Sequence, residues 1–342
     1  MPAPDVTYKY DALIVVSFGG PEGIDDVIPF LENVLRGKNV PHERLLAVAK
    51  HYELFGGVSP LNAQNRQLIT SLEREFDAHG PHLPIYFGNR NWHPLLADTL
   101  NRMRADGVKR ALAFVTSAYS SYSGCRQYLE NIAAARELVG ADAPVVEKIR
   151  AFYSHPEFIR ANAEQIQVAL AQIPERESAH IVFTAHSIPH SMAANCDYVR
   201  QLAETARLVF QELAIGNRAP RAYSLAYQSR SGPPAQPWLE PDICDHLKTL
   251  KDSGVDNVVV APVGFVSDHV EVLYDLDYEA QQVSTELGMK MRRASTAGGH
   301  PAFIKMIREL VLERMDPTAE KRVVGDHDIR PDTCAPGCCS LT

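Results

Sequence analysis

The chain has 342 residues, of which 45% are hydrophobic and 22% are charged, as in an ordinary globular protein. Its formal net charge of −8 argues against a nucleic-acid partner, because neutralising phosphates needs a basic surface. No apolar run approaches about 18 residues and the N-terminus lacks a basic segment followed by an apolar one, so we expect a cytosolic protein without an integral membrane segment.

The first half of the chain contains four short apolar runs that predict β-strands. They lie at Leu13–Ser17, Ile85–Phe87, Ala111–Thr116 and Val145–Ile149. Helical patterns separate them, at Ile24–Leu35, Asn65–Ala78 and Cys125–Leu138.

The second half repeats this alternation. Its predicted strands are His180–Thr184, Ala222–Ala226, Val258–Ala261 and Met289–Arg293, and its helices lie near Pro156–Gln172, Asp197–Leu213 and Pro241–Asp252. Strands that alternate with helices form parallel sheets. We therefore predict an α/β fold of two similar doubly wound domains, 1–150 and 151–300, each with a four-stranded parallel sheet flanked by helices. Residues 301–342 would add a C-terminal helix and a cysteine-rich tail.

His186 directly follows the predicted strand Ile181–Thr184, so its ring is expected at the edge of the sheet where ligands bind. A single histidine is more often structural than functional, and the position is what favours a site. A neutral imidazole can accept a proton near neutral pH or bind a borderline metal such as Fe²⁺. Pro189 would stiffen the loop that aims the ring.

An acidic stripe follows the buried strand Val258–Ala261. Glu271, Asp275 and Glu279 fall four residues apart on the polar side of a predicted helix, and each step of four rotates an α-helix by roughly 40°. Glu271 is nearest to the strand end and is expected to share a cleft with His186. The other two would lie one and two turns deeper, which gives an acidic path that ends at an imidazole.

The stripe carries negative charges only, and this distinguishes a functional site from an ordinary solvated helix face. Like charges four residues apart repel by about 0.2–0.5 kcal/mol per pair, and exposed faces usually interleave lysines. No Lys or Arg occurs between Lys251 and Lys290. The stripe is therefore interpreted as a place where a divalent cation or a proton in transit is handled. Nucleophilic acyl transfer is not indicated, because Ser187 is adjacent to His186 and no Gly-x-Ser-x-Gly elbow exists.

Several segments together resemble the ferrochelatase family. They are Phe183-Thr-Ala-His-Ser-Ile-Pro189, the stretch from Tyr227 to Asp242, the stretch from Pro262 to Glu279, Ser17-Phe-Gly-Gly-Pro21 and Phe55-Gly-Gly-Val-Ser-Pro-Leu61. The likeness covers nearly the whole chain and is strongest to the actinobacterial type, whose substrate is coproporphyrin. It implies a macrocycle bound in a cleft between two four-stranded parallel domains.

The resemblance also implies roles for the acidic path. His186 matches the histidine that receives pyrrole protons or contacts the incoming iron, and Glu271 matches its carboxylate partner. Asp275 and Glu279 match a helix proposed to carry metal or protons, and the sequence leaves open which of the two it carries. Inserting Fe²⁺ releases two pyrrole protons, so a base is needed near the macrocycle centre.

Further residues are assigned to substrate binding by motif match with the family. Arg36, Ser59 and Tyr128 would bind the propionates of coproporphyrin, although each also has an ordinary interpretation as a surface charge, a turn hydroxyl and a packed ring. Some relatives have Tyr where this chain has Phe18, so ligation of iron by a phenolate is excluded there. The polar stretch Leu61-Asn-Ala-Gln-Asn-Arg66 differs from the apolar membrane-docking lip of mitochondrial relatives.

Three of the six cysteines crowd the C-terminus, at Cys334, Cys338 and Cys339. On their own they fit a flexible tail with incidental thiols, a zinc site, or an atypical prenylation box at Cys339-Ser-Leu-Thr342. The resemblance implies a structural [2Fe–2S] cluster held by these three and Cys125, which would pin the tail to the first domain. Because adjacent ligands at 338 and 339 are geometrically awkward, Cys196 or Cys244 is an alternative.

The expected function is that of a monomeric coproporphyrin ferrochelatase that inserts Fe²⁺, its second substrate, to give coprohaem in haem biosynthesis. The same reaction on protoporphyrin is the nearest alternative. An alternative of another class is a tetrapyrrole or iron carrier that has the fold but does not turn over.

Overall fold

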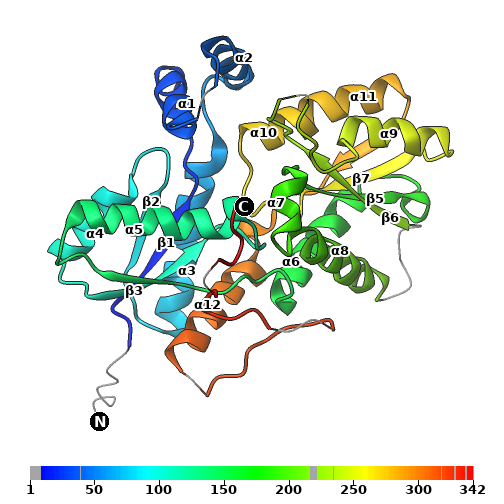
Figure 1. Cartoon of the computed structure of the whole chain (residues 1–342). Helices are drawn as coiled ribbons and strands as arrows, with labels where there is room; N and C mark the ends of the chain where they lie inside the picture. The colour runs from blue at the N-terminus through cyan, green and yellow to red at the C-terminus, as the bar shows by residue number, and fades with distance from the viewer. Residues whose placement is uncertain are drawn as a thin grey trace.

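The computed structural model contains two four-stranded parallel sheets (Figure 1), and it describes residues 9–38, 40–215, 222–233, 235–316, 318–326, 329–335 and 337–341. Pro234, within the stretch from Tyr227 to Asp242, and Thr342, at the end of the possible prenylation box, lie outside the described residues. The first sheet has the order β2-β1-β3-β4, with β1 Ala12–Ser17, β2 Ile85–Asn89, β3 Arg110–Val115 and β4 Val145–Lys148. The second has the order β6-β5-β7-β8, with β5 His180–His186, β6 Ala222–Gln228, β7 Asn257–Ala261 and β8 Lys290–Arg293. The predicted fold class is confirmed.

The central strands form because their apolar runs are covered on both faces. β1 reads Ala-Leu-Ile-Val-Val-Ser and β7 reads Asn-Val-Val-Val-Ala, and every residue in both is buried. Strands of parallel sheets read as continuous apolar runs because helices cover both sides of the sheet. All strands of one sheet therefore end at the same edge, where the loops can carry chemistry.

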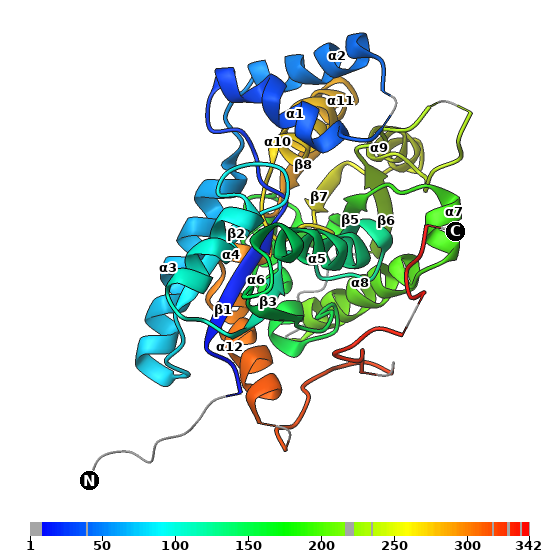
Figure 2. The same ribbon diagram turned by 60° about the vertical axis from the view of Figure 1, so that its left-hand side comes forward.

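The helices of the first half begin with a hairpin, α1 and α2, that stands beyond the carboxyl edge of the sheet (Figures 1 and 2). The elements are η1 Ile24–Asp26, α1 Val27–Leu35, α2 His42–Glu53, α3 Pro60–His79, α4 Leu96–Ala105, η2 Tyr122–Arg126 and α5 Gln127–Val139. Helix α2 contacts α10 Val270–Val272 of the second half. This hairpin therefore bridges the two sheets near their carboxyl edges.

The helices of the second half follow the predicted order with small shifts at their ends. They are α6 Pro156–Leu170, η3 Arg176–Ser178, α7 His190–Ala194, α8 Tyr198–Ala214, α9 Ile243–Asp252, α10 Val270–Val272, η4 Leu273–Ala280, α11 Gln281–Glu286, η5 Ala297–Gly299 and α12 Pro301–Met315. Among the described residues, no helix combines the length and apolar character that crossing a membrane requires. Two elements, η2 and η4, are π-helical turns, which the predicted α-helical periodicity did not anticipate.

One hydrophobic cluster runs through both sheets. It joins Leu13 of β1 and Phe183 of β5 through buried residues of α6, α8 and α12, such as Phe158, Leu202 and Phe303. Helix α12 packs against α3 of the first half and α6 of the second. The division at residues 150 and 300 therefore stays a prediction, because the two sheets share this core.

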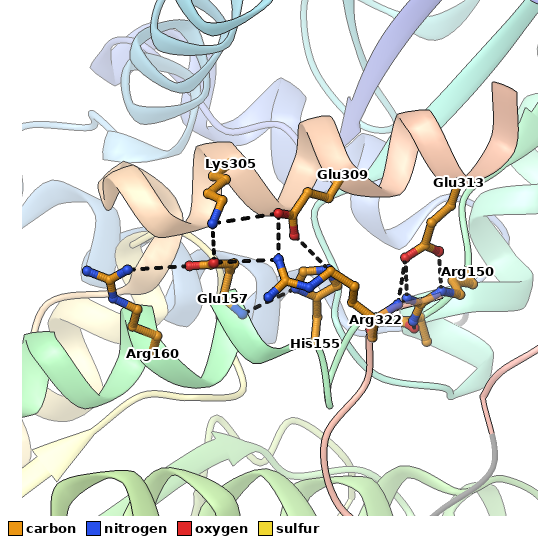
Figure 3. Close-up of polar contacts among 9 residues, drawn as sticks. Arg150, His155, Glu157, Arg160, Lys305, Glu309, Glu313 and Arg322 are labelled. Carbon is orange, nitrogen blue, oxygen red and sulfur yellow. Dashed lines mark hydrogen bonds and ion pairs between the residues drawn. The ribbon is translucent and has the colours of Figure 1, made fainter. Parts of the chain in front are cut away.

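A network of ion pairs fixes the tail against α6 and α12 (Figure 3). Arg150, 2% exposed, binds Glu313 with two parallel hydrogen bonds of 2.9 Å. Arg322 of the tail reaches Glu309 at 2.6 Å, and the Lys305 ammonium donates to Glu157 at 2.6 Å. Paired, bidentate contacts of this kind compensate for the cost of burying the charges. The tail thus has an anchor that involves no cysteine.

Candidate functional site

The imidazole of His186 and the carboxylate of Glu271 lie together at the carboxyl edge of the second sheet. The His186 Nε2 atom is 3.7 Å from Glu271 Oε2, and the two side chains are 33% and 43% exposed. β5 runs two residues further than predicted, so His186 is the last residue of the strand and pairs with Gln228 of β6. Being held in a strand fixes its backbone more firmly than a loop would.

The other ring nitrogen and the neighbouring groups orient this pair. His186 Nδ1 is 2.5 Å from the Ser187 carbonyl oxygen, and the Tyr198 hydroxyl donates to the His186 carbonyl at 3.0 Å. A second imidazole, His269, places its Nδ1 atom 3.9 Å from Glu271 Oε2. Burial lowers the pKa of His269, which favours its neutral form. The Glu271 carboxylate therefore faces two imidazoles.

The three predicted carboxylates lie on one short helical stretch, which changes from α10 to the π-helical η4 after Glu271. A π-turn is wider than an α-turn, so steps of four residues fall slightly short of one turn and keep Glu271, Asp275 and Glu279 on one side. Glu279 is exposed, whereas the other two are partly buried. The expectation that Glu279 lies deepest is therefore wrong, because the helix leads outward from His186 and the line runs from the surface to the imidazole.

Asp275, in the middle of the line, has the most perturbed carboxyl group. Burial raises the pKa of Asp275 to about 7, with further contributions from the negative charges of Glu271 and Glu279. The Ser229 hydroxyl donates to Asp275 Oδ2, and the Gln228 amide donates to the same oxygen at 3.4 Å. The carboxyl group has neutral hydrogen-bond donors around it and can gain or lose a proton near neutral pH.

Nearby carboxylates do have cationic partners, so the absence of such partners is confined to the line formed by Glu271, Asp275 and Glu279. Asp268 and Asp277 both bind the guanidinium of Arg293, at 2.9 and 2.6 Å. Within the described residues no Lys or Arg forms an ion pair with Glu271, Asp275 or Glu279. A cation-free line beside a fully paired one fits a path for positive charge, because an arginine there would compete with the cation that moves.

The first half contributes an aromatic wall next to Glu271. Phe30, Tyr52 and partly buried Trp92 pack in one cluster with Val270, the residue before Glu271. Phe18, at the carboxyl end of β1, is 37% exposed and packs edge-on against Phe30 with ring centroids 6.2 Å apart. Phe30 and Tyr52 are buried, so Phe18 and Trp92 are the rings of this group that are accessible to a flat, apolar ligand.

The hairpin closes onto the acidic line through a pair of stacked rings. His51 of α2 lies 3.7 Å from Tyr274 of η4, centroid to centroid, with 6° between the planes. Burial lowers the pKa of His51, although the negative charges of Glu279 and Glu271 act against it. Sequence reasoning missed both rings, because no clear signal marked α2.

The three residues assigned to propionates are spread over the first half. Arg36 is exposed at the end of α1 and donates to Asn33 Oδ1 at 2.5 Å. Ser59 is 3% exposed and caps α3 by accepting from the Leu61 amide at 3.5 Å. Tyr128 is 5% exposed, with the Arg90 guanidinium 4.5 Å from its ring centroid. Their substrate contacts stay predictions, and the hydroxyl of Ser59 already has a structural task.

Two further residues of the site lie at the end of β6 and at the start of the loop that follows it. Gln228 ends β6, and Ser229 adopts a left-handed backbone conformation with φ of 61°. Non-glycine residues rarely adopt this conformation, which costs about 1–3 kcal/mol and persists where the surroundings enforce it. Here it accompanies the hydrogen bond from the hydroxyl to Asp275. A polar loop after a strand that neighbours the acidic helix was the available signal.

A cavity of about 290 Å³ lies beside this loop. Its lining includes Ser187, Gln228, Arg230 and Asp242. Neither His186 nor Glu271 borders it. The volume is small for a drug-sized ligand, so this cavity is not where we expect the macrocycle.

The cysteines of the tail lie beside Cys125, the buried cysteine of η2. A hydrogen bond with the thiol of Cys334 is the largest cause that lowers the pKa of Cys125, to about 6. Cys338 and Cys339 place their sulfur atoms 3.6 Å apart, with Cys339 at a φ of 53°. The two adjacent sulfur atoms thus lie close together, and their joint ligation of a cluster stays a prediction.

The fit of these thiols to a cluster is partial. In the part of the chain that the structure describes, no three His, Cys, Asp or Glu side chains converge closely enough to hold a metal ion. Cys196 is near Cys338, whose charge contributes to raising its pKa after burial. Cys244 instead lies in α9, beside Asp242, and is wrong as an alternative ligand because it belongs to the core of the second sheet.

Comparisons with known proteins agree on one family. The family model described as ferrochelatase matches residues 10–315, which ends before the tail cysteines. A "Ferrochelatase" of Rhodopirellula baltica is 56% identical over 97% of this chain and 94% of its own length. A "Coproporphyrin III ferrochelatase" of Streptomyces coelicolor is 48% identical over 98% of this chain and 95% of its own, and one of Nocardia farcinica is 50% identical over 96% of each.

Solved structures of similar shape support the fold. SirB from Bacillus subtilis with Fe³⁺ covers 89% of this chain and 98% of its own, with a TM-score of 0.54 at 13% identity. DR2241 from Deinococcus radiodurans, described as structurally similar to chelatases, covers 91% of this chain and 56% of its own, with a TM-score of 0.52 at 14% identity. Both likenesses concern the architecture alone.

Proposed function

This chain belongs to the ferrochelatase family and is a ferrochelatase with Fe²⁺ as a substrate, and on that premise we propose that its porphyrin substrate is coproporphyrin III. The relatives from Streptomyces coelicolor and Nocardia farcinica that bear the name coproporphyrin III ferrochelatase support this choice. The relative from Rhodopirellula baltica bears only the general name. Protoporphyrin is the alternative substrate. Membership of an enzyme family disfavours the carrier alternative.

The observation that carries the proposed mechanism is the 3.7 Å approach of His186 to Glu271 at the carboxyl edge of β5. Insertion of Fe²⁺ forms bonds from iron to the pyrrole nitrogens and releases two N–H protons, without any electron transfer. A neutral imidazole can accept one of these protons at Nε2, and the adjacent carboxylate stabilises the imidazolium that results. His186 and Glu271 are therefore proposed as the residues that handle protons and incoming iron.

Asp275 and Glu279 are proposed to extend this pair to the surface. The pKa of Asp275, raised to about 7, supports a role in passing protons, because such a group is partly protonated and partly ionised near neutral pH. Glu279 is exposed and faces solvent at the outer end. Oxygen ligands would also attract a divalent cation, so the line is the proposed entry for iron as well.

For the tail we propose a [2Fe–2S] cluster with Cys125, Cys334, Cys338 and Cys339 as ligands. The neighbouring thiols of Cys125 and Cys334, and the close pair at 338 and 339, support it. Such a cluster would supply iron–thiolate bonds that tie the tail to η2. Acid-labile sulfide and visible absorbance in protein purified without oxygen are the expected result. Their absence, with all four thiols titratable, would contradict the cluster.

The decisive experiment for the substrate measures metallation without oxygen, with coproporphyrin III and protoporphyrin IX compared at equal concentration. We expect many metallated porphyrins per protein and a higher kcat/KM for coproporphyrin. A higher value for protoporphyrin would reject the proposed substrate. If the Soret shift stopped at one equivalent per protein, the carrier alternative would hold instead.

A further inference from the structure

The segment of the second half that carries Glu271, residues 263–274, is held by side chains of the first half. The Tyr119 hydroxyl, from the loop after β3, donates to the Val263 carbonyl at 3.0 Å. The aromatic wall of the first half packs against the same segment. His186, in contrast, ends β5 inside the second sheet. The distance between the two proposed functional side chains therefore depends on how the two halves hold each other.

The most specific of these contacts is made by Gln64, near the start of α3. Its Oε1 atom accepts from the Asp268 backbone amide at 2.8 Å, and its Nε2 atom donates to Asp268 Oδ2 at 3.3 Å. A backbone N–H can only donate and a carboxylate can only accept, so both bonds fix the same orientation of the Gln64 amide. Asp268 is three residues before Glu271. Gln64 thus holds the start of the acidic line from the opposite half.

Arg293 of β8 holds Asp268 from its own half. The guanidinium donates to Asp268 Oδ1 at 2.9 Å and to Oδ2 at 3.4 Å, and it also binds Asp277 of η4. These two aspartates lie on either side of Glu271 in the chain. Side chains that are locked by hydrogen bonds of their partners keep a site in its working geometry. With Gln64 and Arg293 both bound to Asp268, the backbone that leads into Glu271 has a defined place.

The second half makes a contact of the same kind with the first. Gln201 of α8, which is fully buried, accepts with Oε1 from the Ser120 backbone amide at 2.7 Å and donates from Nε2 to Ser120 Oγ at 3.0 Å. Ser120 lies in the loop after β3, and Asp268 lies in the loop after β7. Each half therefore binds a loop at the carboxyl edge of the other half's sheet with one glutamine. Of the two contacts, that of Gln64 lies three residues from the acidic line.

We infer that Gln64 is a positioning residue for the reaction, which acts through Asp268 to place Glu271 against His186. The 3.7 Å approach of these two side chains then depends on a contact between the halves. This inference rests on the proposed function, which gives His186 and Glu271 their roles. Both polar atoms of the Gln64 amide are used on Asp268, so Gln64 is assigned to geometry and not to binding of the substrate.

The test begins with Gln64→Met, which keeps the length of the side chain and removes both hydrogen bonds. We expect kcat for metallation of coproporphyrin III, measured without oxygen at saturating porphyrin and Fe²⁺, to fall about tenfold or more, as is typical when a group that supports a reacting residue is removed. The Kd of metal-free coproporphyrin III, measured by the Soret shift, should stay unchanged. Thermal unfolding shows whether the variant is folded at the temperature of the assay.

Gln67→Met is the matched control, because Gln67 is exposed and lies three residues further along α3. It makes the same chemical change in the same helix. Both kcat and Kd should equal those of the unaltered chain.

An exchange of the two polar groups tests the contact itself. Gln64→Glu alone puts a second carboxylate against that of Asp268, and it should lower kcat because the like charges repel. Combined with Asp268→Asn, the new carboxylate can accept from both the backbone amide and the side-chain amide of residue 268, and the total charge beside Arg293 is restored. The double variant should recover most of the lost kcat. This pair of variants decides the inference even if Gln64→Met fails to fold.

Three results would overturn the inference. They are an unchanged kcat in folded Gln64→Met, a rise in Kd as large as the fall in kcat, and a double variant that recovers nothing. The second of these would assign Gln64 to substrate binding instead.

The same measurements separate this inference from the proposed function. If the unaltered chain prefers protoporphyrin, the proposed substrate fails, and a lower kcat of Gln64→Met on protoporphyrin still supports the positioning role. If the unaltered chain metallates coproporphyrin and Gln64→Met does so with the same kcat, the positioning role fails and the function stands.

Discussion

Two regions of this molecule each contain three carboxylates, and they treat them in opposite ways. In the ion-pair network of Figure 3, every carboxylate contacts an arginine or lysine; its members are Glu157, Glu309 and Glu313. Along η4, the described residues supply no such partner; its members are Glu271, Asp275 and Glu279. The first arrangement holds the tail, and the second leads to His186.

This difference suggests that the carboxylates paired with cations stabilise the fold, and that the unpaired ones along η4 take part in the chemistry. A partly buried carboxylate without a cation is costly, and its pKa rises as Asp275 shows. Asp268, just before α10, and Asp277 of η4 both pair with Arg293, so the chain could have neutralised their neighbours in the same way. That it leaves them unpaired supports the proposal that a mobile cation meets them.

The largest expected effect is on chemistry at the inner end of the unpaired line. His186→Ala should lower turnover about 10²–10⁴-fold, because a positioned base contributes by that amount. Its melting temperature should change little, since the ring is partly exposed. Single-turnover metallation and thermal unfolding measure the two effects. His190→Ala, on exposed α7, is the control, and full turnover by His186→Ala would refute the assigned role.

A substitution in the ion-pair network of Figure 3 should instead lower the stability of the fold. Glu313→Ala leaves Arg150, 2% exposed, without its partner and should cost about 3–5 kcal/mol of unfolding free energy. The turnover of the folded fraction should stay the same. Urea unfolding gives the free energy, and Glu137→Ala, on the exposed side of α5, gives the baseline. A loss below about 1 kcal/mol would show that the network does not hold the tail.

Asp275→Asn should raise the free energy of unfolding, whereas Glu313→Ala should lower it. The pKa of Asp275 is about 7 in the folded chain and about 3.9 when unfolded, so the unfolded state loses its proton first. Stability therefore falls as pH rises from about 4 to 7, and the variant avoids that loss. We expect it to be about 4 kcal/mol more stable at pH 8 and equal at pH 4, since each unit of pKa difference is worth about 1.4 kcal/mol. It should also turn over more slowly.

Urea unfolding of both proteins across this pH range checks the prediction. Glu279→Gln, whose carboxylate is exposed, should show no such pH-dependent gain. Equal stability of Asp275→Asn and the unaltered chain at pH 8 would mean that the unpaired line carries no energetic cost.

The smallest effect concerns the stacked rings that join α2 to the unpaired line. Tyr274→Leu removes the 3.7 Å contact with His51 and should cost about 0.5–1.5 kcal/mol. A double-mutant cycle with His51→Ala isolates the coupling between the two rings. A coupling near zero would show that the hairpin is held over η4 by its apolar contacts alone, such as those of Val270.

The sequence was sufficient for the fold because the inner strands β1, β3, β5 and β7 are buried apolar runs. Two parallel sheets were predicted from the alternation of strands and helices, and each predicted strand lies within about two residues of the observed one at its ends. The order of the strands within each sheet was not predicted. The positions of His186 and Glu271 followed from one rule, that parallel strands end at a common edge. Those two side chains lie 3.7 Å apart.

The rest depends on contacts that a single sequence does not reveal. A four-residue spacing fits both an α-turn and a π-turn, so η4 could not be distinguished. Arg150 and Glu313 are 163 residues apart in the chain, and nothing local marks them as partners. The hydrogen bond from Ser229 to Asp275 depends on a left-handed residue that is not glycine, which no propensity predicts.

Helix α12 has a consequence for how the chain is made. It supplies Phe303, Ile307 and Leu310 to the cluster that both sheets share, although all eight strands precede it. A ribosome releases the N-terminal part first, so a nascent chain holds both sheets with their common apolar surface uncovered until translation is almost complete. Messenger RNAs truncated before the codons of α12 should therefore yield an insoluble polypeptide that stays bound to chaperones.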